Sequence, residues 1–221
     1  MDKLKTYLKH PLSFVLLILI GLASIITVAS IIFIIIYILV NGIPNLTTDL
    51  FSLHYNSKNQ SMLPSIFNTV FITFLTLLIA VPIGIFSAVY LVEYAKKGSK
   101  LVKVIRVTTE TLAGIPSIVF GLFGFLAFVI ALGWGYSMIA GVLTLVMMVL
   151  PTIIRTTEEA LLAVPNSYRE GSFGLGAGKI RTIFKIIVPT AIPGILSGVI
   201  LAIGRIVGET AALIYTSGTV A

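Results

Sequence analysis

The sequence predicts an all-α membrane protein with five membrane-spanning helices, and its composition and charge spacing lead to that prediction. Of its 221 residues, 57% are hydrophobic and 10% are charged, and the mean hydropathy is +1.10. A soluble domain carries about 25% charged residues. A fold of this chain therefore has too few polar groups to cover its outside, and its apolar side chains must face lipid.

The charged residues are separated by four long uncharged gaps, and a spanning helix needs about 20 mostly apolar residues. The gaps lie between Lys9 and Asp49, Lys58 and Glu93, Glu110 and Arg155, and Lys185 and Arg205. The third gap is long enough for two helices, which a Gly-Trp-Gly-Tyr turn at 133–136 separates. The spans expected are 12–40, 66–92, 113–132, 136–154 and 186–207.

Basic residues predict the orientation of the chain, because Lys and Arg concentrate in cytoplasmic loops. All except Lys58 and Arg205 fall before span 1, between spans 2 and 3, or between spans 4 and 5. These three places share one side of a five-span chain, so the N-terminus is expected in the cytoplasm and the C-terminus outside. The formal charge of +7 is then explained by loops at the membrane lipid, not by nucleic acid.

The start of the chain has the basic residues and apolar run of a signal peptide. The apolar run is about twice the usual length of a signal-peptide core, and no small-residue cleavage site follows it. The segment is therefore expected to be an uncleaved anchor, within a single membrane domain that covers residues 1–221.

The connection at 155–185 is longer than a turn requires, and it is expected to form two short cytoplasmic helices. Thr156 or Thr157 is a suitable cap for the first helix, which Pro165 would end. Ser167 and Glu170 have the spacing of a capping box for the second. Glycines that can terminate this second helix follow at 174, 176 and 178.

This loop resembles the EAA loop of ABC importer permeases. Glu170, Gly171 and Ser172 occupy the Glu-Ala-Ala positions, Gly176 follows at the motif's spacing, and Ile-Ile-Val-Pro at 186–189 matches its end. The resemblance implies a bundle of the type I ABC importer kind and a coupling helix that docks on an ATPase. Its residues would be Glu170, Gly171, Ser172 and Gly176, although Glu170 would also be explained by helix capping alone.

Further motifs resemble the A-type permeases of phosphate-specific (Pst) importers. They are Tyr-Leu-Val-Glu-Tyr at 90–94, Gly-Ile-Pro-Ser-Ile-Val at 114–119, Ile-Arg-Thr-Thr-Glu at 154–158 and Gly-Arg-Ile-Val-Gly-Glu-Thr-Ala at 204–211. The resemblance implies phosphate import across a bacterial or archaeal inner membrane. The implied partners are a homologous permease, an ABC ATPase dimer and an extracytoplasmic phosphate-binding protein. It also implies six spans, so the chain is expected to be truncated after the fifth.

Arg205 and Glu209 are the most informative charges of the last span. At i, i+4 spacing they are expected to pair on one helical face. Ionisable groups within a span usually face the bundle or a water-filled path, so Arg205 is a candidate to meet phosphate, with Glu209 holding it in place. The alternative is that Arg205 only reaches the outer headgroups. The same helix carries two G-x-x-x-G pairs, 194/198 and 204/208, which predict close helix contacts.

The chain is not expected to be an enzyme or to bind a cofactor. It has no cysteine and no H-E-x-x-H motif, and its two histidines lie outside the expected spans. The glycine-rich run at 174–179 fails as a P-loop because residue 173 is Phe and residue 180 is Ile. ATP and Mg²⁺ would therefore bind to the ATPase. Alternatives are a permease for molybdate or sulfate and, less favoured, an ion-coupled secondary transporter.

Overall fold

The computed structural model describes residues 11–53, 55–56, 61–96 and 98–218, and the regular elements of this part are all helical. The chain divides into two compact units, residues 1–64 and residues 65–221. Each unit is described by itself.

The first unit contains one long helix, α2 (Pro11–Gly42), followed by two 3-10 turns at Ile43–Asn45 and Thr48–Phe51. α2 has 32 residues and no charged side chain. At 1.5 Å per residue it is about 48 Å long, which exceeds the roughly 30 Å hydrocarbon core of a bilayer. Its apolar side chains are exposed, as suits a helix that lies in lipid.

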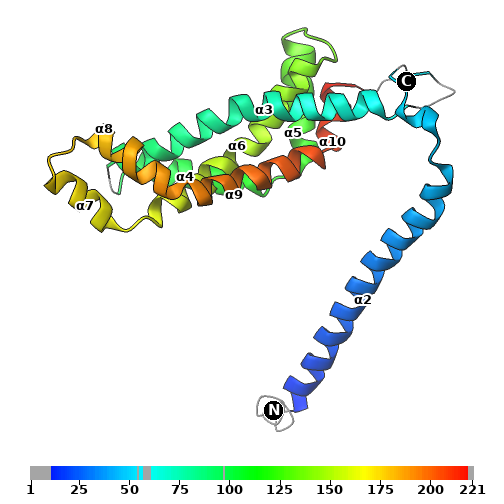
Figure 1. Cartoon of the computed structure of the whole chain (residues 1–221), viewed down its shortest axis with the longest axis horizontal. Coiled ribbons are helices and arrows are strands. Elements are labelled where there is room, and N and C mark those ends of the chain that lie inside the picture. Colours follow the sequence, from blue (N-terminus) through cyan, green and yellow to red (C-terminus); the bar gives the residue numbers. More distant parts are fainter. Residues whose placement is uncertain (1–10, 54, 57–60, 97, 219–221) are drawn as a thin grey trace. The chain divides into compact units, whose positions relative to one another are not determined.

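The second unit begins within α3 and contains the remaining helices. They are α3 (Leu63–Val89), η3 (Tyr90–Tyr94), α4 (Lys100–Ala113), α5 (Ser117–Gly124), η4 (Phe125–Ala131), α6 (Met138–Leu162), α7 (Asn166–Gly174), α8 (Lys179–Thr182), η5 (Ile183–Ile187), α9 (Val188–Val207) and α10 (Ala211–Thr216). In Figure 1, α7 and α8 lie together at one end of α3, α6 and α9, and α10 lies towards the other end.

Four helices of the described chain are long and apolar enough to cross a membrane: Leu12–Asn45, Leu63–Tyr94, Met138–Leu162 and Lys179–Val207. A fifth crossing exists if α4 and the helix Ser117–Ala131 count as one broken span, bent by 102°. The bend has a local cause. Pro116 has no N–H to continue the helix, and its ring disfavours a helical conformation at Ile115.

Helix α6 is the centre of the second unit, where it packs against α4, α5, α9 and α10. Its residues Leu145, Met148, Val149 and Ile153 are 0 to 1% exposed and form the middle of the largest core cluster. The expected first short helix of the cytoplasmic loop does not exist. α6 continues unbroken to Leu162, so the expected caps Thr156 and Thr157 lie inside it, where the Thr156 hydroxyl donates to the Thr152 carbonyl (2.9 Å).

The two G-x-x-x-G pairs of α9 behave differently. A Cβ at Gly194 would clash with Ala160, and one at Gly198 would clash with Thr156, so the first pair sits directly against α6. A Cβ at Gly204 would meet nothing within 4 Å, and one at Gly208 would meet only the Gly204 carbonyl. The prediction of close helix contact is therefore confirmed for the first pair. The second pair lies where α9 ends and meets no other helix within the described part of this chain.

Candidate functional site

The short helix α7 carries the predicted coupling residues Glu170, Gly171 and Ser172. Pro165 precedes it, and Gly176 follows it. Pro165 occupies the N-cap position, and no side chain makes a capping hydrogen bond there. The predicted capping box of Ser167 and Glu170 is therefore wrong. The helix already begins at Asn166, which puts Ser167 within the first turn instead of at the cap.

The C-terminal end of α7 is a Schellman motif. Gly176 has φ +80°, its N–H donates to the Phe173 carbonyl (2.9 Å), and the Ala177 N–H donates to the Ser172 carbonyl (3.1 Å). A left-handed residue at this position is typical of helix ends and favours glycine. The prediction that Gly176 terminates the helix is confirmed.

The predicted coupling residues of α7 lie on different faces of the helix. Glu170 and Gly171 are exposed, and a Cβ at Gly171 would meet nothing within 4 Å. Ser172 is 5% exposed, and its hydroxyl is 2.8 Å from that of Thr182 on α8. Ser172 therefore fastens α7 to the chain's own next helix, while Glu170 and Gly171 remain available to a partner.

Large apolar side chains are exposed on α7 and just after it. Tyr168 and Phe173 are 49% and 48% exposed, and Leu175, just after the helix, is 91% exposed. Apolar side chains this exposed, outside the long helices, are typical of a surface that a protein partner covers. We call Tyr168, Glu170, Phe173 and Leu175 the α7 surface.

Arg169 holds the other side of α7, and sequence reasoning did not single it out. Its Nη2 and Nε lie 2.7 and 3.0 Å from Glu93 Oε1, in η3. Its Nη1 donates to the Val164 carbonyl (2.9 Å), and its Nη2 to the Leu161 carbonyl (3.1 Å). The Arg169 and Glu93 side chains are 17% and 10% exposed. Glu93 belongs to the Tyr-Leu-Val-Glu-Tyr motif, but nothing in the sequence indicates its partner 76 residues away.

The predicted substrate-path residues Arg205 and Glu209 are not paired. α9 ends at Val207, and among the described residues no ion pair joins the two. The Glu209 carboxylate accepts instead from the Ala212 N–H (3.0 Å), at the start of α10. The predicted i, i+4 pair is wrong because the helix stops between its two members.

Glu209 lines a pocket of about 580 Å³ in the second unit. Arg205 is half-buried and does not line it. Polar residues of α3 form part of the opposite wall, at the helical spacing of Ser65, Asn68, Thr69 and Thr73. A row of hydroxyl and amide groups is unusual on an otherwise apolar spanning helix, and such groups generally face the bundle or a polar path.

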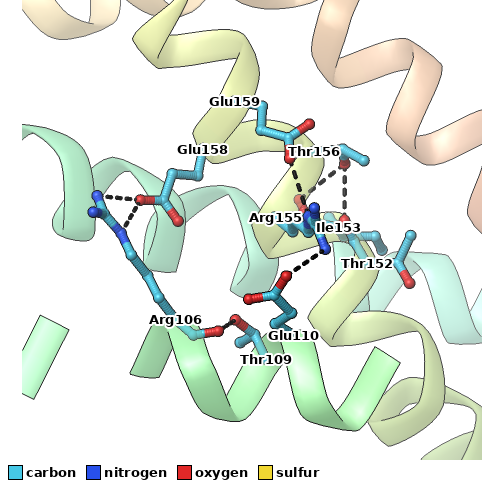
Figure 2. A network of polar contacts seen from close by, with 9 residues as sticks. All are labelled: Arg106, Thr109, Glu110, Thr152, Ile153, Arg155, Thr156, Glu158 and Glu159. Atoms are coloured by element: carbon cyan, nitrogen blue, oxygen red, sulfur yellow. Dashed lines mark hydrogen bonds and ion pairs between the residues drawn. The ribbon is translucent and has the colours of Figure 1, made fainter. Parts of the chain in front are cut away.

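A second group of charges joins α4 to α6, and Figure 2 shows it at close range. Arg106 Nε and Nη2 lie 2.6 and 2.5 Å from Glu158 Oε1. Arg155 lies 3.0 Å from Glu159 and 3.6 Å from Glu110. Glu158 is 8% exposed, and these residues line a small pocket of about 200 Å³. Sequence reasoning used Arg155 as a cytoplasmic basic residue and Arg155 and Glu158 as part of a family motif, and it did not predict their link to α4.

Comparison with known proteins places the chain among transport permeases. Residues 80–220 match the family model described as binding-protein-dependent transport system inner membrane component. The probable ABC transporter permease protein YqgI of Bacillus subtilis is 38% identical over 200 residues, which are 90% of this chain and 68% of that protein. The phosphate transport system permease protein PstA 1 of Mycobacterium tuberculosis is 45% identical over 140 residues, covering 63% and 45% of the two chains.

The fold also has a counterpart among solved structures. Inward-facing MetNI, a methionine ABC transporter, has a chain that superposes with a TM-score of 0.54 at 23% identity. The match covers 67% of this chain and 68% of that one. At this identity the likeness concerns the fold alone. The chain spans less than half of PstA 1 and about two thirds of YqgI.

Proposed function

The chain belongs to the family of binding-protein-dependent transport system inner membrane components, and we propose that it is a permease subunit of an ATP-driven importer of inorganic phosphate. The phosphate assignment is supported by identity of 45% to PstA 1 of Mycobacterium tuberculosis and 36% to PstA of Xylella fastidiosa. Both relatives are named as phosphate transport system permeases.

The observation that carries the transport mechanism is the α7 surface, whose apolar side chains and Glu170 are exposed. Helix α7 lies at one end of α3, α6 and α9 (Figure 1). A permease has to receive mechanical work from a separate ATPase, which requires a docking surface outside the membrane. Gly171 adds a flat position to this surface, and Gly176 ends the helix so that Leu175 stays exposed. We assign Glu170, Gly171 and Gly176 to the docking of an ABC ATPase dimer, and Ser172 to holding α7 in place.

The remaining partners and the orientation follow from the same proposal. The chain would pair with a homologous permease subunit, and an external phosphate-binding protein would deliver the anion. The N-terminus lies in the cytoplasm in this proposal, because the basic residues gather on the side of α7. ATP and Mg²⁺ bind to the ATPase, so this chain performs no catalysis.

In this mechanism, ATP binding closes the ATPase dimer and moves α7, and the spans then rock from inward-facing to outward-facing. Phosphate enters near the pocket lined by Glu209, and the guanidinium of Arg205 interacts with it further along. A planar guanidinium matches the geometry of a phosphate oxyanion well. The absence of an Arg205–Glu209 ion pair among the described residues leaves this guanidinium free of a competing carboxylate from that side chain.

Uptake of labelled phosphate tests the proposal. Cells that lack their own high-affinity phosphate uptake receive the full coding sequence that contains this chain, together with its partner genes. We expect ATP-dependent phosphate uptake that excess sulfate and molybdate do not compete. Uptake suppressed by molybdate or sulfate would assign the permease to that oxyanion instead, and energisation by an ion gradient without ATP would contradict an ABC permease.

A further inference from the structure

We infer that Glu93 and Arg169 form a clamp that transmits the movement of α7 to the spanning helix α3. This inference rests on the proposed function and names the positioning residues through which the docked helix acts. α3 and η3 form the continuous apolar helix Leu63–Tyr94, and Glu93 stands at its α7 end. The ion pair therefore joins the coupling helix to the end of a span.

Helix α7 has little apolar attachment to the rest of the chain. The cluster of buried apolar residues beneath the loop draws on the ends of α3, α6, η5 and α9, and Val164 is its member nearest to α7. Within α7 the buried residue is Ser172. A helix whose large apolar side chains stay about half exposed gains less from the hydrophobic effect than a helix with a buried apolar stripe, so polar contacts contribute more to its position.

Two polar contacts fasten the inner face of α7, and they differ in what they reach. Ser172 contacts Thr182 on α8, the helix that follows directly in the sequence. Arg169, three residues earlier on the same face, reaches Glu93 on η3, the Leu161 carbonyl of α6 and the Val164 carbonyl just after α6. Arg169 is therefore the contact that ties α7 to helices distant in the sequence.

The chemistry of the clamp suits the transmission of force. Two guanidinium nitrogens engage one carboxylate oxygen while the same group donates to two backbone carbonyls, and both side chains are largely buried. Charge-assisted hydrogen bonds of a planar guanidinium have a defined direction, and burial protects them from screening by salt. Lysine has a single ammonium on a flexible stem, so it cannot satisfy the carboxylate and both carbonyls in the same geometry.

A second contact between η3 and the loop supports this assignment. The ammonium of Lys179, the first residue of α8, lies 4.6 Å from the centre of the Tyr94 ring. Residues 93 and 94 thus each meet a different helix of the loop. The end of the α3 span is therefore joined both to α7 and to the helix that leads into α9.

The test compares transport with ATP hydrolysis in the complete importer reconstituted in proteoliposomes. For Arg169→Ala and Glu93→Gln we expect the ATPase to remain bound and to hydrolyse ATP, while phosphate moved per ATP falls by about tenfold, within the usual range of coupling between sites. Arg169→Lys should recover part of this ratio, because the positive charge beside Glu93 remains. The control is Arg181→Ala, an exposed arginine of α8, which should keep the wild-type ratio.

A purely structural role would lower the amount of assembled complex and leave the ratio of phosphate to ATP unchanged in what remains, which would overturn the inference. A wild-type importer that moves no phosphate would instead contradict the proposed function. The clamp is then tested without a substrate, by the spread of distances between spin labels at Leu78→Cys on α3 and Ser167→Cys, an exposed position in the first turn of α7. ATP with vanadate should leave this spread narrow in the wild type and broaden it in Arg169→Ala, and equal spreads would contradict the clamp.

Discussion

At position 176 the backbone adopts a left-handed conformation, φ +80°, in open space where a Cβ would meet nothing within 4 Å. Any loss of stability in Gly176→Ala therefore comes from the backbone alone, and we expect about 1 kcal/mol. Gly176→Asn should lose less, since Asn tolerates this conformation. Thermal unfolding in detergent measures both.

The matched control is Gly171→Ala, which lies inside α7 and likewise has an open surrounding. Alanine there favours the helix by up to about 1 kcal/mol, so the two substitutions should shift the unfolding temperature in opposite directions. Equal shifts would mean that the turn after α7 does not depend on a left-handed residue.

Arg205 and Glu209 share no ion pair within the described chain, so their substitutions should act independently. We expect Arg205→Ala to abolish phosphate uptake and Arg205→Lys to retain part of it, because the positive charge remains. Glu209→Gln should preserve more uptake than Glu209→Ala, since an amide oxygen still accepts from the Ala212 N–H. The double variant Arg205→Lys with Glu209→Gln should retain a fraction of wild-type uptake equal to the product of the fractions that the two single variants retain, within a factor of about two. Normal uptake in both Arg205 variants would remove Arg205 from the path.

At the scale of elements, the contact between α6 and α9 depends on small residues at defined positions. A Cβ at Gly198 would clash with Thr156, whereas one at Gly204 would meet nothing within 4 Å. Gly198→Ala should therefore destabilise the bundle by about 1–3 kcal/mol through overpacking, while Gly204→Ala should be neutral or stabilising. Unfolding in a denaturing detergent series compares the two, and Thr156→Gly should partly rescue Gly198→Ala. Equal loss from both alanines would show that the contact between Gly198 and Thr156 is not what limits the residue at position 198.

The whole molecule has a proposed orientation that cysteine labelling can test directly, because the chain contains no cysteine of its own. Ile180 is 67% exposed in α8, outside the α7 surface, and Leu53 is 71% exposed in the segment between the first two spans. A membrane-impermeant maleimide should label Leu53→Cys in intact cells and Ile180→Cys only after permeabilisation. The reverse pattern would invert the topology and place the α7 surface where no cytoplasmic ATPase could reach it.

The sequence by itself determined the class of the fold and the positions of most long helices. Apolar composition and uncharged gaps predict which segments enter the bilayer, because the free energy of transfer into lipid depends on the residues of the segment itself and not on the helices that it later contacts. It also limited the end of α7 to the glycines at 174, 176 and 178, because the preference of glycine for left-handed backbone is a local property, and the structure selects Gly176. The motifs at 170–176 and 186–189 were enough to indicate the transport family.

Tertiary structure alone decided which charges meet. The i, i+4 spacing predicts a pair of Arg205 and Glu209 only if one helix contains both residues. α9 ends at Val207, and the Glu209 carboxylate accepts from the Ala212 N–H of α10 instead. Glu93 and Arg169 meet from positions 76 residues apart, and Arg106 and Glu158 from positions 52 apart. The attraction between such groups exists only once the backbones of α3, α4, α6 and α7 are packed, since charges separated along a solvated chain are screened. Local sequence patterns therefore do not predict these ion pairs.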